Sequence, residues 1–211
     1  MRAVLTAGPT LEPIDPVRFL SNRSSGKQGY ALAEALAAVG FEVTLVSGPT
    51  ALNDPPGVQT VRVETAREML TAVERALPAD VFIAVAAVAD WRPAEPSATK
   101  LKLDKSGHGA LKLAENPDIL KNIAGLDPEA RPRLVIGFAA ETHDVLEHAR
   151  AKRVRKGCDW IIANDVSGSA MGGANNAVTL ITRDGEESLA EAPKSEIARQ
   201  IAQRIAAAFK T

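Results

Sequence analysis

The chain alternates short apolar segments with longer amphipathic ones, and this order constrains the fold more than any other feature. Segments suited to β-strands are AVLTAG (3–8), FEVTLVSGP (41–49), VQTVRVE (58–64), VFIAVAAVAD (81–90), RLVIGFAAE (133–141) and WIIAND (160–165). Strands that alternate with helices pair in parallel and place helices over both faces of the sheet. The sequence therefore predicts an α/β, Rossmann-like fold with a mostly parallel sheet covered on both faces.

Helix signals fill the spaces between these strands. Alanine and leucine recur at helical spacing over 26–39, and Gly40 marks the end of that helix. Thr65 and Glu68 form a Thr-x-x-Glu capping box that opens a second helix through about Leu77. Further helices are predicted near Pro117, from about 144 to 156, and over the amphipathic segment 195–209.

Three segments depart from simple alternation. The run VFIAVAAVAD (81–90) is apolar without period, which predicts a central strand buried on both faces. The Pro-rich segment WRPAEPSAT (91–99) interrupts the pattern, and KLKLDKSGHGALKL then predicts a projecting β-hairpin arm at about 100–115. AVTLITRDGEESLA (177–190) predicts a closing antiparallel hairpin. The whole chain, 1–211, is interpreted as one domain with one arm.

Charge and composition exclude several classes of protein. A net charge of −1 provides no electrostatic basis for binding nucleic acid or a membrane surface. The apolar run at 81–89 is too short to span a bilayer, and no signal peptide opens the chain. Cys158 is the single cysteine, so a disulfide framework is excluded and a buried, small hydrophobic role is expected. These features predict a cytoplasmic protein.

The stretch SNRSSGK (21–27) resembles a phosphate-binding loop but matches neither standard motif. The Walker pattern fails at both ends, at Ser21 and Gln28, and the first strand runs into AGPTLEP without the dinucleotide glycine pattern. The backbone N–H groups of Ser24, Ser25 and Gly26 would still face an anion at a helix start. A serine N-cap followed by a packing glycine is the alternative interpretation.

Polar and small residues gather where the predicted strands end. The segments GPTLEPID, AAVADWRP, GFAAET and ANDVSGSA each follow a strand. In open parallel sheets, ligands bind beyond the carboxyl ends of the strands. The sequence therefore predicts one ligand site along this edge.

Seven motifs, in order from about Ala3 to the final helix, resemble the phosphopantothenoylcysteine synthetase family. They are TAGPTLEPIDPVRFLSNRSSGKQGYALAEAL, SGP, TAREMLTAV, AAVADWRP, NPDIL, GFAAET and ANDV. The resemblance implies the ligase of coenzyme A biosynthesis, which in bacteria is often the C-terminal half of a bifunctional protein with a decarboxylase. It further implies CTP as co-substrate in bacterial members, Mg²⁺, and a homodimer formed through the arm.

The implied reaction joins 4′-phosphopantothenate to L-cysteine in two steps. The substrate carboxylate attacks the α-phosphate of CTP, which releases pyrophosphate and leaves an acyl-cytidylate. The cysteine amine then attacks the acyl carbon and releases CMP. Cations must neutralise the anions in the first step, and a neutral donor suits the oxyanion of the second.

The resemblance also implies site residues. Asn22 matches an asparagine assigned to the acyl-nucleotidylate, Lys100 matches the first lysine of a Lys-x-Lys-Lys motif, and Arg18 matches an arginine near the substrate. Asn22 and Lys100 are the predicted catalytic residues, and Arg18 and Asn22 the substrate-binding ones. The predicted nucleotide contacts are Ser24, Ser25, Gly26, Ala86, Ala87, Asp90, Lys100, Gly137, Phe138, Ala139, Ala140 and Lys156. No metal ligand is predicted.

Each residue also has a structural alternative. Arg18 suits a surface salt bridge, Lys100 a solvated strand face, and Asp90 a turn. Phe138 suits the core, and Lys156 the negative end of a helix dipole.

Other features depart from the family pattern or leave the function open. Leu103 stands where the family commonly has lysine, and Met171 and Ala174 differ within the loop 167–176, whose role is left open. His108, His143 and His148 are assigned no role. The alternatives in function are an NAD(P)- or flavin-dependent oxidoreductase and a non-catalytic nucleotide-sensing module. A free-standing enzyme and a domain of a bifunctional parent both fit the sequence, and no residue distinguishes CTP from ATP.

Overall fold

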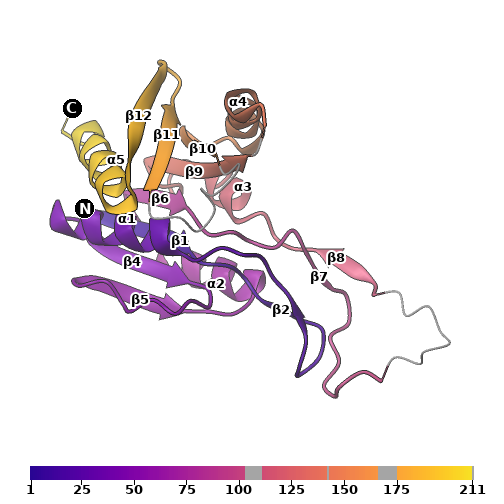
Figure 1. Ribbon diagram of the computed structural model, residues 1–211. Coiled ribbons are helices and arrows are strands. Elements are labelled where there is room, and N and C mark those ends of the chain that lie inside the picture. Colours follow the sequence, from indigo (N-terminus) through magenta and orange to yellow (C-terminus); the bar gives the residue numbers. More distant parts are fainter. Residues whose placement is uncertain (103–110, 142, 166–174, 211) are drawn as a thin grey trace.

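A computed structural model describes residues 1–102, 111–141, 143–165 and 175–210, and its centre is one eight-stranded sheet (Figure 1). The strand order is β12-β11-β10-β9-β6-β1-β4-β5. The parallel strands are β1 (Arg2–Ala7), β4 (Glu42–Ser47), β5 (Val58–Arg62), β6 (Val81–Ala84), β9 (Leu134–Glu141) and β10 (Trp160–Asp165). The antiparallel pair β11 (Asn175–Ile181) and β12 (Glu186–Pro193) completes one edge. The predicted Rossmann-like sheet and its closing hairpin are confirmed.

Helices cover both faces, as the alternation predicted. The helices α1 (Lys27–Ala38) and α5 (Lys194–Ala208) pack on one face, and α2 (Ala66–Ala76), α3 (Ile119–Ala124) and α4 (Val145–Lys156) pack on the other. Adjacent residues of β6 point into opposite cores, because Ile83 belongs to the first core and Phe82 to the second. Cys158 is buried, as predicted. No helix within the described ranges has the length and apolar character to cross a membrane.

Local signals set the helix ends. Thr65 Oγ1 accepts from the N–H of Glu68 at 3.2 Å, and the Glu68 carboxylate accepts from the N–H of Thr65 at 3.3 Å, so the capping box is formed. Gly157 ends α4 in the left-handed region, with φ of 70°. Such a residue avoids the steric cost that a Cβ would bring there.

The central strand is shorter than predicted. Strand β6 ends at Ala84, and 85–90 leaves the sheet as a loop, so the prediction of a strand through Asp90 is wrong. The reason is that hydroxyl groups of the first strand and its loop bind this backbone. Thr6 Oγ1 accepts from the N–H of Ala86 at 3.3 Å, and Thr10 Oγ1 accepts from the N–H of Ala89 at 3.0 Å.

The arm begins earlier than predicted. The paired strands at its base are β7 (Trp91–Pro93) and β8 (Leu113–Glu115), which extend away from the main sheet in Figure 1. Residues 100–102 belong to no strand, so the predicted start at Lys100 is wrong, and the predicted turn at 103–110 lies outside the described residues. The N–H of Leu101 instead donates to the Asp15 carboxylate at 3.2 Å, which removes it from strand pairing.

Candidate active site

Two hollows open at the carboxyl edge of the sheet, on either side of the loop 85–90. We call the first, of about 520 Å³, the acid–lysine hollow; it is lined by Thr6, Ala84, Ala86, Val88, Ala89, Asp90, Trp91, Glu115, Asn116, Pro117, Asp118, Ile119, Leu120, Phe138, Lys152 and Lys156. We call the second, of about 220 Å³, the amide hollow; it is lined by Gly8, Asn22, Arg23, Ser24, Ser25, Gly26, Lys27, Gln28, Gly29, Val85, Ala87, Phe138, Ala139, Ala140, Asn164 and Lys194. Phe138 lines both.

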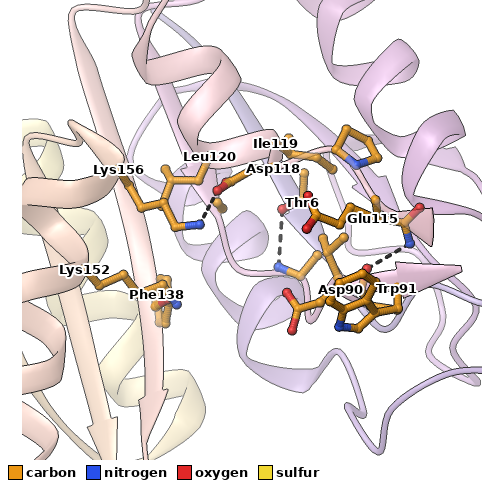
Figure 2. Close-up of a pocket in the computed structure, with 16 residues that line it drawn as sticks. Thr6, Asp90, Trp91, Glu115, Asp118, Ile119, Leu120, Phe138, Lys152 and Lys156 are labelled. Atoms are coloured by element: carbon orange, nitrogen blue, oxygen red, sulfur yellow. Dashed lines mark hydrogen bonds and ion pairs between the residues drawn. The ribbon is translucent and has the colours of Figure 1, made fainter. Parts of the chain in front are cut away.

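The acid–lysine hollow brings opposite charges together. Figure 2 shows Lys156 and Asp118 pointing toward each other as an ion pair, with Asp90 and Trp91 across the hollow. Burial raises the pKa of the Asp118 carboxyl, but the hydrogen bond from Lys156 and the N–H of Lys121 outweigh it and leave the pKa below its usual range. Asp118 therefore stays ionised and holds Lys156 at the wall of the hollow.

A second lysine on α4 also reaches this hollow. Lys152 Nζ donates to the carbonyl oxygen of Phe138 at 2.8 Å. Burial lowers the pKa of Lys152, with the nearby cations Lys156 and Arg155 acting in the same direction. The carboxylate of Glu141 acts in the opposite direction, and an anionic ligand would likewise raise this pKa by stabilising the ammonium form.

Sequence reasoning missed Asn116, Asp118 and Lys152 as residues of this hollow. Asn116 Nδ2 donates to the carbonyl of Ala89 at 2.8 Å, and its N–H donates to the carbonyl of Asp90 at 2.8 Å. These bonds join the end of the arm to the loop 85–90. The NPDIL motif contains Asn116 and Asp118 and was the available signal for them, whereas no motif pointed to Lys152.

The amide hollow is built around the start of α1. Gly26 is the N-cap, with φ of 75°, and no side chain caps the helix, so the predicted alternative of a serine N-cap is wrong. The hollow's lining contains the cations Arg23, Lys27 and Lys194 and no carboxylate among the described residues. Uncapped N–H groups, the helix dipole and cations together favour an anionic ligand.

Two glycines at the start of α1 allow its backbone to pack closely against neighbouring segments. A Cβ at Gly26 would lie 2.8 Å from Thr50 Cγ2, and one at Gly29 would lie 2.6 Å from the Cβ of Ala7. The second contact shows why α1 needs glycine at that position, which is the close approach of the helix to β1.

Asn22 lies at the mouth of the amide hollow and joins two segments. Its Nδ2 donates to the carbonyl of Ala87 at 2.5 Å, and its Oδ1 accepts from the N–H of Ser24 at 3.0 Å. The amide is thus held in one orientation beside the loop that separates the hollows. A neutral donor placed in this way can face an oxyanion without binding a carboxylate strongly.

Most of the predicted site residues line one of the two hollows, but some do not. Ala86, Asp90, Phe138 and Lys156 line the acid–lysine hollow, and Asn22, Ser24, Ser25, Gly26, Ala87, Phe138, Ala139 and Ala140 line the amide hollow. Lys100 is exposed and lines neither. Gly137 also lines neither; a Cβ there would lie 2.6 Å from Leu120 Cδ2, which makes this glycine a packing residue.

Arg18 lies at the base of the arm. Its guanidinium pairs with the buried Asp15 carboxylate at 2.5 Å and donates to the carbonyl of Leu101 at 3.0 Å. The hydrogen bond from Arg18 holds the pKa of Asp15 well below its usual range. The arginine therefore fastens the arm to the turn that follows β2 (Glu12–Pro13), and its contact with a substrate stays a prediction.

The fold and its two hollows define a class: a Rossmann-like α/β domain whose polar and cationic groups gather along the carboxyl edge of the sheet. The chain belongs to the DNA/pantothenate metabolism flavoprotein C-terminal domain family, whose profile matches residues 1–209. The family resemblance read from the sequence is confirmed.

The chain is similar in sequence to one half of the bifunctional CoaBC proteins of several bacteria. It is 48% identical over 194 residues to the Coenzyme A biosynthesis bifunctional protein CoaBC of Escherichia coli (strain K12), covering 90% of this chain and 47% of that protein. It is 45% identical over 206 residues to the protein of that name from Vibrio parahaemolyticus, covering 96% of this chain and 51% of that protein. The chain spans about half the length of these relatives.

Two solved structures share the fold. The C-terminal domain of the Coenzyme A biosynthesis bifunctional protein CoaBC matches with a TM-score of 0.82 and 43% identity, over 99% of this chain and 95% of that one. The DNA/Pantothenate Metabolism Flavoprotein from Streptococcus pneumoniae matches with a TM-score of 0.81 and 23% identity, over 98% and 99% of the two chains, which supports the fold alone.

Proposed function

We propose that the chain is a phosphopantothenate–cysteine ligase of coenzyme A biosynthesis. It joins 4′-phosphopantothenate and L-cysteine to give 4′-phosphopantothenoylcysteine, with conversion of CTP into pyrophosphate and CMP. Family membership and the similarity to the C-terminal domain of the CoaBC proteins support this activity.

One observation carries the mechanism: a single loop, 85–90, separates the two hollows, and Phe138 lines both. A ligand in one hollow therefore lies next to a ligand in the other. The reaction needs this arrangement, because a carboxylate and a nucleotide α-phosphate must meet.

The first step is the attack of the substrate carboxylate on the α-phosphate of CTP. In our proposal Ala86, Asp90 and Phe138 contact the nucleoside, while Lys156 and the amide groups at the start of α1 face phosphate oxygens. These cations and N–H groups offset the repulsion between two anions. A phosphorus–oxygen bond forms to the carboxylate, and pyrophosphate leaves.

The second step is the attack of the cysteine amine on the acyl carbon. The Asn22 amide, which is bonded to Ala87 in the loop between the hollows, donates to the developing oxyanion, after which CMP leaves with the bonding electron pair. The attacking amine loses a proton as the amide forms. Lys100, from the arm, acts chiefly in the first step, where it neutralises triphosphate charge.

Magnesium fits this site as a partner of the phosphates. Mg²⁺ is commonly held by one or two carboxylates together with substrate phosphates, and Asp90 is an exposed carboxylate at the rim of the acid–lysine hollow. When bound, the ion supplies charge neutralisation for the phosphate oxygens. Asp118 is less available, because Lys156 already occupies its carboxylate.

The proposed partners follow from the family and from the surface. Large apolar side chains are exposed at the arm base, and we propose that a second copy of the chain covers them; these are Phe19, Trp91, Leu111 and Leu113. The length of the relatives supports fusion to a decarboxylase in the native protein. A cytoplasmic location remains a prediction.

The test separates the two steps by removing the Asn22 amide. We expect Asn22→Ala to retain CTP binding and to form pyrophosphate and acyl-cytidylate, while amide formation falls about 10²–10³-fold, as when an oxyanion donor is lost. Pyrophosphate is measured by a coupled assay, and the intermediate by mass spectrometry after an acid quench.

The matched control is Asn53→Ala, which alters an exposed asparagine that lines neither hollow. This variant should react at the unaltered rate. Absence of the acyl-cytidylate in Asn22→Ala, with normal CTP binding, would contradict the assignment of Asn22 to the second step. Release of pyrophosphate that does not depend on phosphopantothenate would contradict the ligase itself.

A further inference from the structure

A group of metal-ligating side chains lies outside both hollows, between the end of β9 and the first turn of α4. Glu141 is the last residue of β9, Asp144 is the N-cap of α4, and His148 lies one turn into that helix. His143 precedes the N-cap. The reaction proposed above uses none of these four side chains.

The ligand atoms of this group are close together. One ligand atom each from His143, Asp144 and His148 lies within 4.8 Å of the others. The two imidazole rings meet edge to face, with centroids 5.0 Å apart and planes at 86°. His148 Nδ1 also lies 3.7 Å from Glu141 Oε2, so a second carboxylate borders the group.

Asp144 adds an independent observation. Aspartate is among the best N-cap residues, yet its side chain makes no cap hydrogen bond to α4. Its backbone has φ of 46° and ψ of 40°, and it is the one non-glycine residue with positive φ in the described ranges. Aspartate adopts this left-handed conformation more readily than most residues, but it is uncommon outside glycine. The Asp144 carboxylate, which does not cap the helix, thus lies within 4.8 Å of a ligand nitrogen of each histidine.

We propose that His143, Asp144 and His148 bind a divalent transition-metal ion of the zinc type, with Glu141 as the fourth ligand. Two imidazoles with carboxylates suit Zn²⁺, whereas Mg²⁺ and Ca²⁺ take oxygen ligands. Zinc–nitrogen bonds of about 2.0–2.1 Å place tetrahedral ligands about 3.3 Å apart. The present separations, within 4.8 Å, are larger than this, so the exposed side chains of His143 and Asp144 would move closer on binding the ion.

No other group of three such side chains with this proximity occurs in the described part of the chain. A bound ion would join the end of β9 to the first turn of α4. The same helix carries Lys152 and Lys156 into the acid–lysine hollow. Metal binding would therefore rigidify the element that presents both lysines, although the site itself does not depend on the proposed ligase activity.

The experiment measures zinc binding to the full chain without a histidine tag. Isothermal titration with zinc sulfate, after treatment with a chelator, should reveal one equivalent of bound Zn²⁺ and a rise in the unfolding temperature. The double variant H143N/H148N keeps polar side chains of similar size. It should weaken binding far more than tenfold, because even the outer partners of a metal ligand are worth about 10–100-fold in affinity.

The matched control is H108N, which removes the remaining histidine of the chain. It should bind zinc as the unaltered protein does. A second readout is the visible spectrum after titration with Co²⁺, since nitrogen and oxygen ligands in a tetrahedral arrangement give intense d–d bands that H143N/H148N should lose. The proposal is overturned if the unaltered chain binds no zinc, or if the double variant binds it equally well.

Discussion

Gly26 and Gly40 adopt the same left-handed backbone for different reasons. Their φ angles are 75° and 93°, but a Cβ at Gly26 would contact Thr50 at 2.8 Å, whereas one at Gly40 would meet nothing within 4 Å. The first glycine brings the backbone of α1 to the amide hollow, and the second only ends a helix. This pair allows the cost of backbone strain to be separated from the loss of ligand binding.

We expect Gly26→Ala and Gly40→Ala each to lose about 1–2 kcal/mol of unfolding free energy from the left-handed conformation. Gly26→Ala should in addition raise the KM for CTP, because the start of α1 must shift away from Thr50. Urea unfolding measures the first quantity and steady-state kinetics the second. An unchanged KM in Gly26→Ala would show that the start of α1 does not bind the nucleotide.

The ion pair of Lys156 and Asp118 raises a second question at the residue scale. As a structural pair, each side chain stabilises the other, and the two single variants should be equivalent. As a nucleotide site, the lysine acts on the ligand and the aspartate positions the lysine. We expect Lys156→Met to raise the KM for CTP about tenfold or more and Asp118→Asn to raise it less. Equal effects, with the double variant no worse than either, would favour the structural role.

At the scale of elements, the base of the arm depends on one buried carboxylate. Asp15 accepts from the N–H groups of Val17, Arg18 and Leu101 and from the Arg18 guanidinium. Two segments of the chain, the turn 15–18 and the start of the arm segment at Leu101, therefore meet at one side chain. Both the arm and the turn after β2 lose their common anchor if this charge is removed.

The lowered pKa of Asp15 makes the stability that this carboxylate contributes depend on pH. Because the folded pKa lies below the unfolded value of about 3.9, the stabilisation is complete above that value and is lost as the pH falls through the folded pKa. We expect Asp15→Asn to unfold at a lower temperature than the unaltered chain above about pH 5, and the difference to shrink below pH 4. Calorimetry from pH 7 to pH 3 measures this.

Asp54→Asn is the control, because Asp54 forms an exposed ion pair with Arg62 at 2.5 Å. Exposed pairs are worth about 0–1 kcal/mol, so this variant should change the unfolding temperature little at any pH. A difference between Asp15→Asn and the unaltered chain that stays constant down to pH 3 would argue against ionised Asp15 as the anchor.

The elements also show where sequence reasoning succeeds. The capping box of α2 was predicted to the residue, because both of its bonds lie within one turn. The prediction of where β6 ends was wrong, because the hydroxyl groups of Thr6 and Thr10, about 80 residues away in the chain, bind the backbone there. Interactions between near neighbours can be predicted from a sequence. A hydrogen-bond partner from a distant element, which competes with strand pairing, cannot.

At the scale of the whole molecule, the apolar surface at the arm base has no cover within the described residues. Trp91 is 48% exposed and Leu113 is 47% exposed, on paired strands that extend from the body of the protein (Figure 1). Two short strands are not stable alone in water and gain stability from a second surface. In the dimer proposed above, a second copy of the chain would supply this surface.

We expect the double variant W91D/L113D to be monomeric, because dimerisation would bury two carboxylates per chain. Sedimentation velocity at micromolar concentration measures the mass of the unaltered chain and the variant. Val154→Asp on α4 is the control, since Val154 is 75% exposed and lies away from the arm. A monomeric unaltered chain with full activity would contradict the dimer.

The sequence by itself determined the α/β alternation, the mostly parallel pairing of the strands and the capping box of α2, because periodicity and capping act over a few neighbouring residues. It also carried the motifs that identify the family. The tertiary structure decided which of these residues share a hollow. Lys156 and Asp118 form their ion pair across 38 positions, Asn116 joins the arm to the loop 85–90, and Gly137 turns out to be a packing residue. Such contacts arise from the packing of elements against one another, and no local pattern along the chain encodes them.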